Sequence, residues 1–267
     1  MVTERMILSG GAEMDAYVPG AAVQGDRDRI GLIICPGGSY TRHSPREQER
    51  VALRFAPLGM SCFVLRYHVS PWRFPTQLMD AAQAVRLVRE HAKEYRVHPD
   101  RIAVMGFSSG GHVAGCLGTM WHRQELMAQA GCTPAQARPN AMVLCYPVVT
   151  AGPFVHRGSF VHLTGETDET QHMALSLETL VSPETPPAFL WHTWPDDDVP
   201  VENTLLMATA LHRAGVRAEV HLYGEGPHGL ALADATTAAA DRPDMNVTVV
   251  QGWPEQAARF LRSILIQ

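Results

Sequence analysis

Short runs of consecutive apolar residues alternate along this chain with longer segments whose apolar residues recur every three or four positions. The short runs predict β-strands buried on both faces, and the longer segments predict amphipathic helices. This alternation is typical of an α/β protein in which helices cover both faces of a mostly parallel sheet. The predicted strands are 30–35, 61–69, 101–106, 141–148, 187–193 and 217–223.

Several predicted helices have recognisable ends. Ser44, Pro45 and Glu47 fit a capping box that would open a helix, and Gly59 would end it. Pro254 favours the first turn of the last helix. The helices predicted from periodicity and these end signals cover about 44–59, 75–95, 109–130, 201–215 and 254–266.

Two stretches, about 150–186 and about 231–250, show no strong periodicity. The first lies between two predicted core strands, where an insertion into this architecture would form a cap or rim over a site. A chain of 267 residues can bury the core of one large α/β domain. We therefore predict a single domain over 1–267 with a cap or rim insertion at about 150–186.

The sequence GFSSGG directly follows a predicted strand. Gly106 and Gly110 lie two positions on either side of Ser108, which is the GxSxG pattern of a nucleophile elbow. Glycines favour this place because a strand-to-helix turn this sharp leaves no room for side chains. The same frame excludes Ser109, because Phe107 would then stand at a glycine position. We predict that Ser108 is a catalytic nucleophile.

A serine hydroxyl is a poor nucleophile, so it needs a base and an acid that orients the base. In enzymes with this elbow, the acid and then a histidine follow the serine, each in a loop after a strand. The three carboxylates of 196–198 follow the strand predicted at 187–193, and His228 follows the strand predicted at 217–223. The order and the loop positions predict His228 as the base, and they leave open which aspartate is the acid.

The reaction also needs amide donors for the negative charge that develops on the carbonyl oxygen. The sequence CPGGSY ends the first predicted strand in a glycine pair whose backbone can approach a substrate closely. We assign the backbone N–H groups of Gly38 and Ser39 to this oxyanion hole. The N–H of Ser109, at the start of the helix after the elbow, would complete it.

Composition and charge exclude several classes of partner. The chain is 46% hydrophobic and 18% charged, as expected of a globular protein, and its formal charge of −5 argues against a nucleic-acid partner. No apolar stretch is long enough for a membrane span or a signal peptide, so we expect a cytoplasmic protein. The five cysteines lie mostly in apolar segments, which suits buried reduced thiols, and none has metal-ligand spacing. We expect no metal and no cofactor.

The segments CPGGSYTRHSPREQERVALRF, VLRYHVSP, HPDRIAVMGFSSGGHVAG, FLWHTWPDDDVPVENTLLMATALHRAGV and PHGLAL together resemble one family of enzymes. They are similar to the acetyl-xylan-esterase-like branch of the α/β-hydrolase serine esterases, which is related to the hormone-sensitive-lipase and prolyl-oligopeptidase groups. The resemblance covers most of the chain and implies an α/β-hydrolase fold. It also implies hydrolysis of small acyl esters, often of acetylated sugars, without a cofactor.

The resemblance also decides among the aspartates. In similar proteins the acid lies four residues after a histidine that ends a strand and three before a valine, which from His192 and Val199 gives Asp196. Asp197 is the alternative, and Asp198 is better placed to cap the helix that begins near Val201. Many related esterases have HGGG at the oxyanion loop, whereas this chain has Pro36 and Ser39 at the first and last of these positions.

The favoured hypothesis is a serine carboxylesterase with Ser108, His228 and Asp196 as its catalytic residues. A prolyl-oligopeptidase-like peptidase or amidase is the alternative, and a non-catalytic ligand-binding homologue of the same fold is a further one. The expected partner is a small-molecule ester, with no nucleic acid and no membrane. The sequence leaves open whether the chain forms a homodimer.

Overall fold

One mixed sheet organises the protein, whose computed structural model describes residues 2–20 and 29–266. In these ranges eight strands follow one another across the sheet in the order β1-β2-β4-β3-β5-β6-β7-β8. β2 pairs antiparallel with both β1 and β4, and every other neighbouring pair is parallel. The strands are β1 (Val2–Ile7), β2 (Glu13–Val18), β3 (Arg29–Cys35), β4 (Met60–Arg66), β5 (Val97–Phe107), β6 (Ala141–Cys145), β7 (Ala188–Thr193) and β8 (Ala218–Tyr223).

The interior strands are apolar at nearly every position because both of their faces are covered. In β3 the six residues after Arg29 are all buried. Ile33 lies opposite Phe63 of β4 on one side and Val104 of β5 on the other. Since parallel strands point in one direction, the carboxyl ends of β3 and of β5 to β8 lie at the same edge of the sheet.

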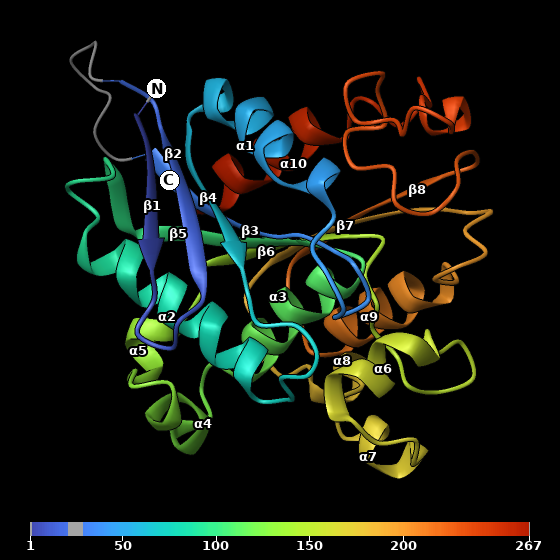
Figure 1. Ribbon diagram of the computed structural model, residues 1–267, viewed down its shortest axis with the longest axis horizontal. Helices are drawn as coiled ribbons and strands as arrows, with labels where there is room; N and C mark the ends of the chain where they lie inside the picture. Colours follow the sequence, from blue (N-terminus) through green and yellow to red (C-terminus); the bar gives the residue numbers. More distant parts are fainter. Residues whose placement is uncertain (1, 21–28, 267) are drawn as a thin grey trace.

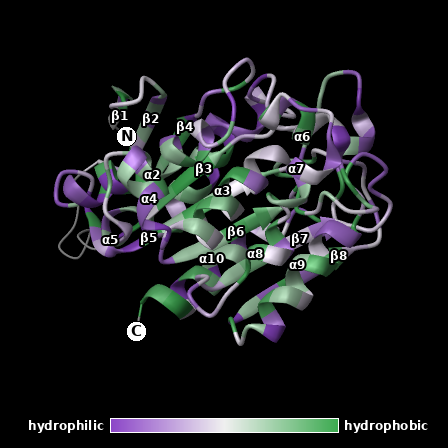
Figure 2. Ribbon diagram, turned by 90° about the horizontal axis from the view of Figure 1, so that it is seen from below, coloured by the Kyte–Doolittle hydropathy of each residue, from purple (hydrophilic) through white to green (hydrophobic). Residues whose placement is uncertain are grey.

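Helices cover the two faces of the sheet, as Figure 1 shows. α1 (Glu49–Phe55) and α10 (Trp253–Leu265) pack on one face, where Phe55 and Trp253 belong to one buried core. α2 (Thr76–Glu90), α3 (Ser109–Met120) and α9 (Glu202–Arg213) pack on the other face over a second core. The strands in the middle of the sheet are largely apolar in Figure 2. The shorter helices outside the rim segment described next are α4 (Gln124–Gln129), α5 (Pro134–Ala137), η1 (Pro45–Glu47), η2 (Ala56–Leu58) and η3 (Pro243–Met245).

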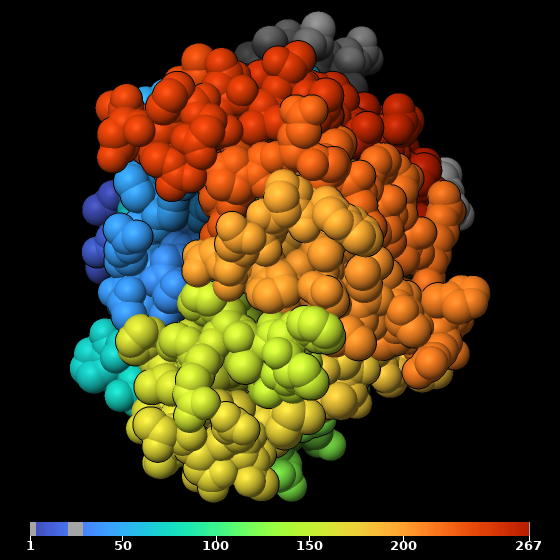
Figure 3. Space-filling view, turned by 90° about the vertical axis from the view of Figure 1, so that its right-hand side faces the viewer, coloured from blue at the N-terminus to red at the C-terminus, as the bar shows by residue number. Residues whose placement is uncertain are grey.

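Two long segments lie beyond the carboxyl ends of the strands. The rim segment, residues 150–186, carries the short helices α6 (Arg157–Thr164), α7 (Glu169–Met173) and α8 (Leu177–Leu180). Residues 231–250 are almost without regular structure but bury Val250 and other apolar side chains against α10. In Figure 3 both segments reach the same face of the molecule, together with the segment that follows β3.

The predicted fold class is confirmed, and the six predicted strands correspond to β3 to β8. The hairpin of β1 and β2 was not predicted, because its residues alternate between charged and apolar and form no continuous apolar run. Arg5 of β1 and Asp15 of β2 form an ion pair of 2.8 Å on the surface of this hairpin. Exposed charges of this kind are usual where a sheet ends.

The predicted capping box at Ser44 is wrong. Ser44 makes no side-chain cap, and the chain passes through the 3-10 turn η1 before α1 begins at Glu49. The carboxylate of Glu47 points into the protein instead, where it accepts hydrogen bonds from Gly37 and Tyr146. Glu47 therefore bonds to buried groups of other segments and not to the backbone at the start of its own helix.

The helix predicted over 109–130 is two helices. α3 ends at Met120 and α4 begins at Gln124, with Trp121 between them. The buried Trp121 donates a hydrogen bond from its indole to the backbone oxygen of Glu184, at the end of the rim segment. No helix in the described ranges is long and apolar enough to cross a membrane.

Candidate active site

Ser108 lies at the apex of the turn between β5 and α3. Its backbone has φ 52° and ψ −121°, a strained conformation for a residue with a side chain. The glycines around it are required by contact, because a Cβ on Gly106 would collide with the backbone of Gly110. A Cβ on Gly110 would collide with the carbonyl oxygen of Cys35 at the end of β3. The glycines of the GxSxG pattern therefore allow the turn to pack against its own helix and the neighbouring strand.

The base loop, residues 224–233, brings His228 to this serine. His228 Nε2 lies 2.9 Å from Ser108 Oγ, and His228 Nδ1 lies 2.7 Å from Asp196 Oδ2. Along the sequence, His228 is 120 residues from Ser108 and 32 residues from Asp196. Because Asp196 accepts at Nδ1, the proton of the neutral ring is on Nδ1, and Nε2 is free to accept the proton of the serine hydroxyl.

The acid loop, residues 194–201, fixes both oxygens of Asp196. Oδ1 accepts the backbone N–H groups of Asp198 at 3.1 Å and Val199 at 2.9 Å. Oδ2 accepts from His228 and also from Nε2 of His192, which lies 3.1 Å away. His192 is held in turn by Thr204, whose Oγ1 lies 2.8 Å from its Nδ1. Each carboxylate oxygen of Asp196 thus accepts two hydrogen bonds, and the side chain is fully buried.

Within the described residues, neither of the other two aspartates of the acid loop forms a hydrogen bond with His228. Asp197 is exposed, and Asp198 pairs with Nε2 of His156 in the rim segment at 3.5 Å. Asp198 does not cap the next helix as predicted, because α9 begins at Glu202 without a side-chain cap. Asp198 pairs with His156 instead, and His156 itself caps the N-terminus of α6.

The oxyanion loop, residues 36–40, lies against the nucleophile. A Cβ on Gly37 would be 3.0 Å from the Cβ of Ser108, so only glycine fits there. Gly38 and Ser39 have φ of 136° and 54°, and within the described ranges neither backbone N–H has a hydrogen-bond acceptor. Ser109 is the first residue of α3, where an N–H has no acceptor within the helix. The three predicted amide donors are thus free to bind a ligand oxygen.

Surrounding segments fix the outer side of this loop. The Ser39 carbonyl oxygen lies 3.0 Å from Nδ1 of His162 in α6. The backbone N–H of Ser70 donates to the backbone carbonyl oxygen of Tyr40 at 2.7 Å. The buried His112 joins the Tyr40 hydroxyl at 2.7 Å to the Leu175 backbone oxygen at 2.9 Å. The position of the oxyanion loop therefore depends on α3 and on the rim segment.

Electrostatics favour an ionised Asp196 and stabilise the protonated form of His228 beside it. Burial alone would raise the pKa of Asp196, but the hydrogen bonds from His192 and His228 lower it far below its usual range. Burial alone would lower the pKa of His228, but the hydrogen bond and charge of Asp196 outweigh it and raise that pKa above its ordinary value. The charges of Asp198 and Glu47 act in the same direction.

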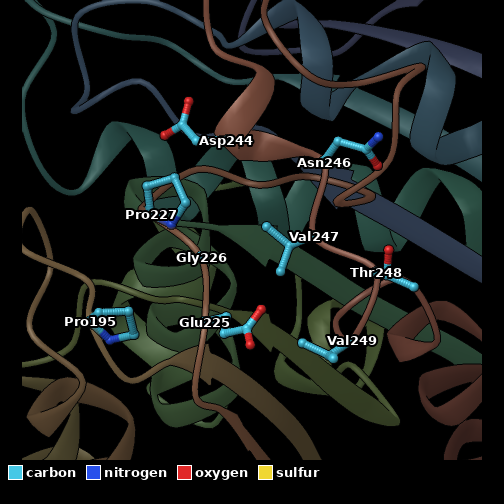
Figure 4. Close-up of a pocket in the computed structure, with 9 residues that line it drawn as sticks. All are labelled: Pro195, Glu225, Gly226, Pro227, Asp244, Asn246, Val247, Thr248 and Val249. Atoms are coloured by element: carbon cyan, nitrogen blue, oxygen red, sulfur yellow. The ribbon is translucent and has the colours of Figure 1, made fainter.

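Apolar rings and a groove lie around these loops. Trp72 and Trp194 are 54% and 61% exposed, and Trp194 stands two residues before Asp196. A groove of about 520 Å³ lies beside the base loop. Figure 4 shows its lining residues, of which Pro195 and Pro227 directly precede Asp196 and His228. The groove is lined by Pro195, Glu225, Gly226, Pro227, Asp244, Asn246, Val247, Thr248 and Val249. In the described part of the chain, no three His, Cys, Asp or Glu side chains gather so that they could hold a metal ion.

The sequence profile of the BD-FAE family matches residues 14–211. The chain belongs to this family of α/β hydrolases. The resemblance to the acetyl-xylan-esterase-like branch is thereby confirmed, and the match includes the oxyanion loop, the elbow and the acid loop.

Two solved structures extend the similarity over nearly the whole chain. An acetyl ester-xyloside bifunctional hydrolase from Caldicellulosiruptor lactoaceticus is 37% identical, with a TM-score of 0.81 over 95% of this chain and 88% of its own. A carboxylesterase from Lactobacillus plantarum is 28% identical, with a TM-score of 0.88 and complete coverage of both chains. Endo-1,4-beta-xylanase B of Butyrivibrio fibrisolvens is 34% identical over 78% of this chain, which spans only 34% of that larger protein.

Sequence reasoning missed several residues that position this site. His192 served only to locate Asp196, although it also binds the carboxylate, and Glu47 was assigned to a helix cap. Tyr146, the first residue after β6, carried no motif at all. Its position at the carboxyl end of a central parallel strand was the one available signal.

Proposed function

We propose that the protein is a serine carboxylesterase that hydrolyses small acyl esters, including acetylated sugars, through an acyl-enzyme intermediate. The observation that carries the proposal is the continuous hydrogen-bonded series from Ser108 through His228 to Asp196. Free amide donors stand beside it on the oxyanion loop and at the start of α3. Nucleophile, base, orienting acid and oxyanion donors are the four parts that acyl transfer needs.

The first half of the reaction forms the acyl-enzyme. Ser108 Oγ attacks the ester carbonyl carbon while His228 Nε2 takes the hydroxyl proton, and Asp196 stabilises the resulting imidazolium. The N–H groups of Gly38, Ser39 and Ser109 bind the negative oxygen of the tetrahedral intermediate. When the intermediate collapses, the bond to the alcohol oxygen breaks, and His228 gives its proton to the leaving alcohol.

The second half releases the acid. A water molecule gives a proton to His228 Nε2 and attacks the acyl carbon, and the same three amides bind the new oxyanion. Collapse breaks the bond to Ser108, which takes the proton back from His228. The enzyme ends in its starting state, with one ester and one water converted to one acid and one alcohol, and no step needs a metal or a cofactor.

Acetylated sugars are favoured as substrates by two observations. The Caldicellulosiruptor relative is an acetyl ester-xyloside bifunctional hydrolase, and the Butyrivibrio relative is an endo-1,4-beta-xylanase. Trp194 lies in the acid loop, and Trp72 follows by two residues the Ser70 that bonds the oxyanion loop; both rings are exposed, and their flat apolar faces suit the apolar face of a sugar ring. The groove beside the base loop carries Glu225 and Asp244, which would disfavour an anionic alcohol.

We further propose that residues 1–267 form one domain in which the rim segment borders the acyl site. Its support is the bond from His162 to the oxyanion loop and the pair of His156 with Asp198 of the acid loop. A cytoplasmic location is supported by the five free, buried cysteines, which suit a reducing compartment.

We expect a preference for short acyl chains. The helices of the rim segment have eight, five and four residues, too short for a long apolar lid, and Ser39 adds a side chain at the oxyanion loop. The measurement is kcat/KM on aryl esters from acetyl to octanoyl, beside acetylated xylo-oligosaccharides and a peptide amide. Acetyl esters should be hydrolysed fastest. Faster turnover of octanoyl esters would contradict the preference, faster turnover of the amide would indicate a peptidase, and no turnover at all would indicate a non-catalytic homologue.

We expect kcat/KM to fall as the pH drops through the pKa of His228. The neutral imidazole is the active base, and Asp196, Asp198 and Glu47 raise its pKa, so the midpoint should lie above that of an ordinary histidine. A pH–rate profile on a neutral aryl acetate measures it. Asp198→Asn removes one of the raising charges and should move the midpoint to lower pH, while exposed Asp197→Asn is the control. A midpoint below the ordinary value in the unmodified enzyme would show that burial dominates instead.

A further inference from the structure

Glu47 is a buried carboxylate whose two oxygens bind different loops of the candidate site. It is 2% exposed, Oε2 accepts the backbone N–H of Gly37 at 2.7 Å, and Oε1 accepts the hydroxyl of Tyr146 at 2.8 Å. The Tyr146 oxygen itself accepts the backbone N–H of Ala231 at 2.9 Å. One side chain thereby connects the oxyanion loop to the base loop through a single tyrosine.

Both ends of this connection touch the reacting groups. Gly37 precedes the Gly38 and Ser39 amides and lies so close to Ser108 that no side chain fits. Ala231 follows His228 by three residues, and the Tyr146 ring meets the His228 ring edge-on, with centroids 5.0 Å apart. A shift of Glu47 or Tyr146 would therefore move the oxyanion donors and the base relative to the nucleophile.

Backbone strain is concentrated in the segments that this connection joins. Seven non-glycine residues in the described ranges have positive φ, and six of them lie in the oxyanion loop, at the elbow, directly after β6 or in the base loop. They are Ser39, Tyr40, Ser108, Tyr146, Ala231 and Ala233, and only Arg96 lies elsewhere. Strained backbone of this kind persists only where the surroundings hold it in place.

A buried carboxylate is a costly way to hold two loops together. Burial opposes the charged form and raises the pKa of Glu47, although the bonds from Tyr146 and Gly37 act against that rise. A local helix cap would have required no burial, and the sequence around Ser44 could have provided one. The carboxylate is instead directed to the two loops that carry the reaction.

We propose that Glu47 is a positioning residue, which acts through Gly37 and Tyr146 to hold the oxyanion donors and His228 in register with Ser108. This inference rests on the proposed esterase function. Glu47 does not touch the substrate. It fixes the geometry in which the transition state, more than the bound ester, is stabilised, so its loss should lower kcat and leave KM nearly unchanged.

Glu47→Gln is the variant that tests the proposal. The amide has nearly the shape of the carboxylate but only one acceptor oxygen. If that oxygen keeps Gly37, the NH₂ group faces the Tyr146 hydroxyl, so two donors oppose each other and the hydroxyl hydrogen loses its acceptor. We expect kcat on an aryl acetate to fall by about 10- to 100-fold, because displacing a positioned group by about 1 Å can cost about 10²-fold.

Three companion variants make the experiment specific. Glu49→Gln is the matched control, since it makes the same chemical change at an exposed position two residues away and should keep the original kcat. Tyr146→Phe keeps the ring against His228 but removes the hydroxyl, so kcat should fall as in Glu47→Gln. The double variant should be little worse than either single one, because both break the same connection.

The rate of labelling of Ser108 by an organophosphate provides a second readout. It should slow in Glu47→Gln and Tyr146→Phe in proportion to kcat, since the reagent also needs the base and the oxyanion donors. An unchanged kcat in either folded variant would overturn the proposal, as would a change confined to KM or fully additive losses in the double variant. If Glu47→Gln does not fold, Tyr146→Phe still decides the outcome. Lack of ester hydrolysis by the unmodified enzyme would instead contradict the proposed function itself.

Discussion

Ser108→Ala should remove ester hydrolysis almost completely, with kcat lower by about 10⁵- to 10⁶-fold, as when the nucleophile of a serine hydrolase is deleted. The reason is chemical, because among the residues that the structure describes no other hydroxyl bonds to His228 Nε2. The fold should persist, since alanine is smaller than serine and has the same access to the backbone conformation of the elbow. The measurement combines the rate on an aryl acetate with thermal unfolding.

The exposed Ser263 on α10 offers a control, because Ser263→Ala removes a hydroxyl far from the candidate site and should keep full activity. Labelling by an organophosphate should modify Ser108 in the unmodified enzyme and should be lost in Ser108→Ala. A label on Ser109, or normal turnover by the alanine variant, would show that the elbow has been assigned to the wrong residue.

Asp196→Asn should lower kcat by roughly 10⁴-fold, which is the loss of kcat seen when an asparagine forces the wrong histidine tautomer. The loss of stability should be small. The amide oxygen would keep the backbone N–H groups of Asp198 and Val199, which now bind Oδ1. The NH₂ group must then face His228 Nδ1 in place of Oδ2. It donates where an acceptor is needed, so the proton of His228 moves to Nε2, and the ring can no longer accept the proton of Ser108.

Asp197→Asn makes the same change one residue further on, at an exposed side chain that does not reach His228. It should leave kcat close to that of the unmodified enzyme. The two variants are compared by kcat on an aryl acetate at a pH well above the pKa of His228. Equal losses in both, or a large loss in Asp197→Asn alone, would mean that the acid loop rearranges when substrate binds.

The sequence placed the elements of the fold well where the local signal was strong. Apolar runs predicted the central strands, because a strand covered on both faces can hold almost nothing polar. The sequence pattern did not predict the β1–β2 hairpin, where one face is exposed and Arg5 and Asp15 interrupt the apolar pattern. It failed again at Ser44 and Glu47, because a capping box is a local pattern and the true partners of Glu47 are Gly37 and Tyr146.

The sequence by itself predicted which residues would react. The spacing of glycines selects Ser108 over Ser109, because that constraint is a collision within one turn of the chain. Chain order after two strands selects His228, and a family offset selects Asp196. Each of these signals is short-range or carried by the order of strands in a parallel sheet, so a linear pattern contains it.

Only the tertiary structure decided what holds these residues in place. Asp196 is distinguished from Asp197 by its contacts with His192, Val199 and His228, and the contact with His228 depends on how β7 and β8 pair. Glu47 meets Tyr146 across 99 residues. Such contacts form where the carboxyl ends of parallel strands gather at one edge of the sheet. A buried polar group there bonds to the donor that packing brings next to it. Because that donor can lie far away along the chain, no local sequence pattern predicts it.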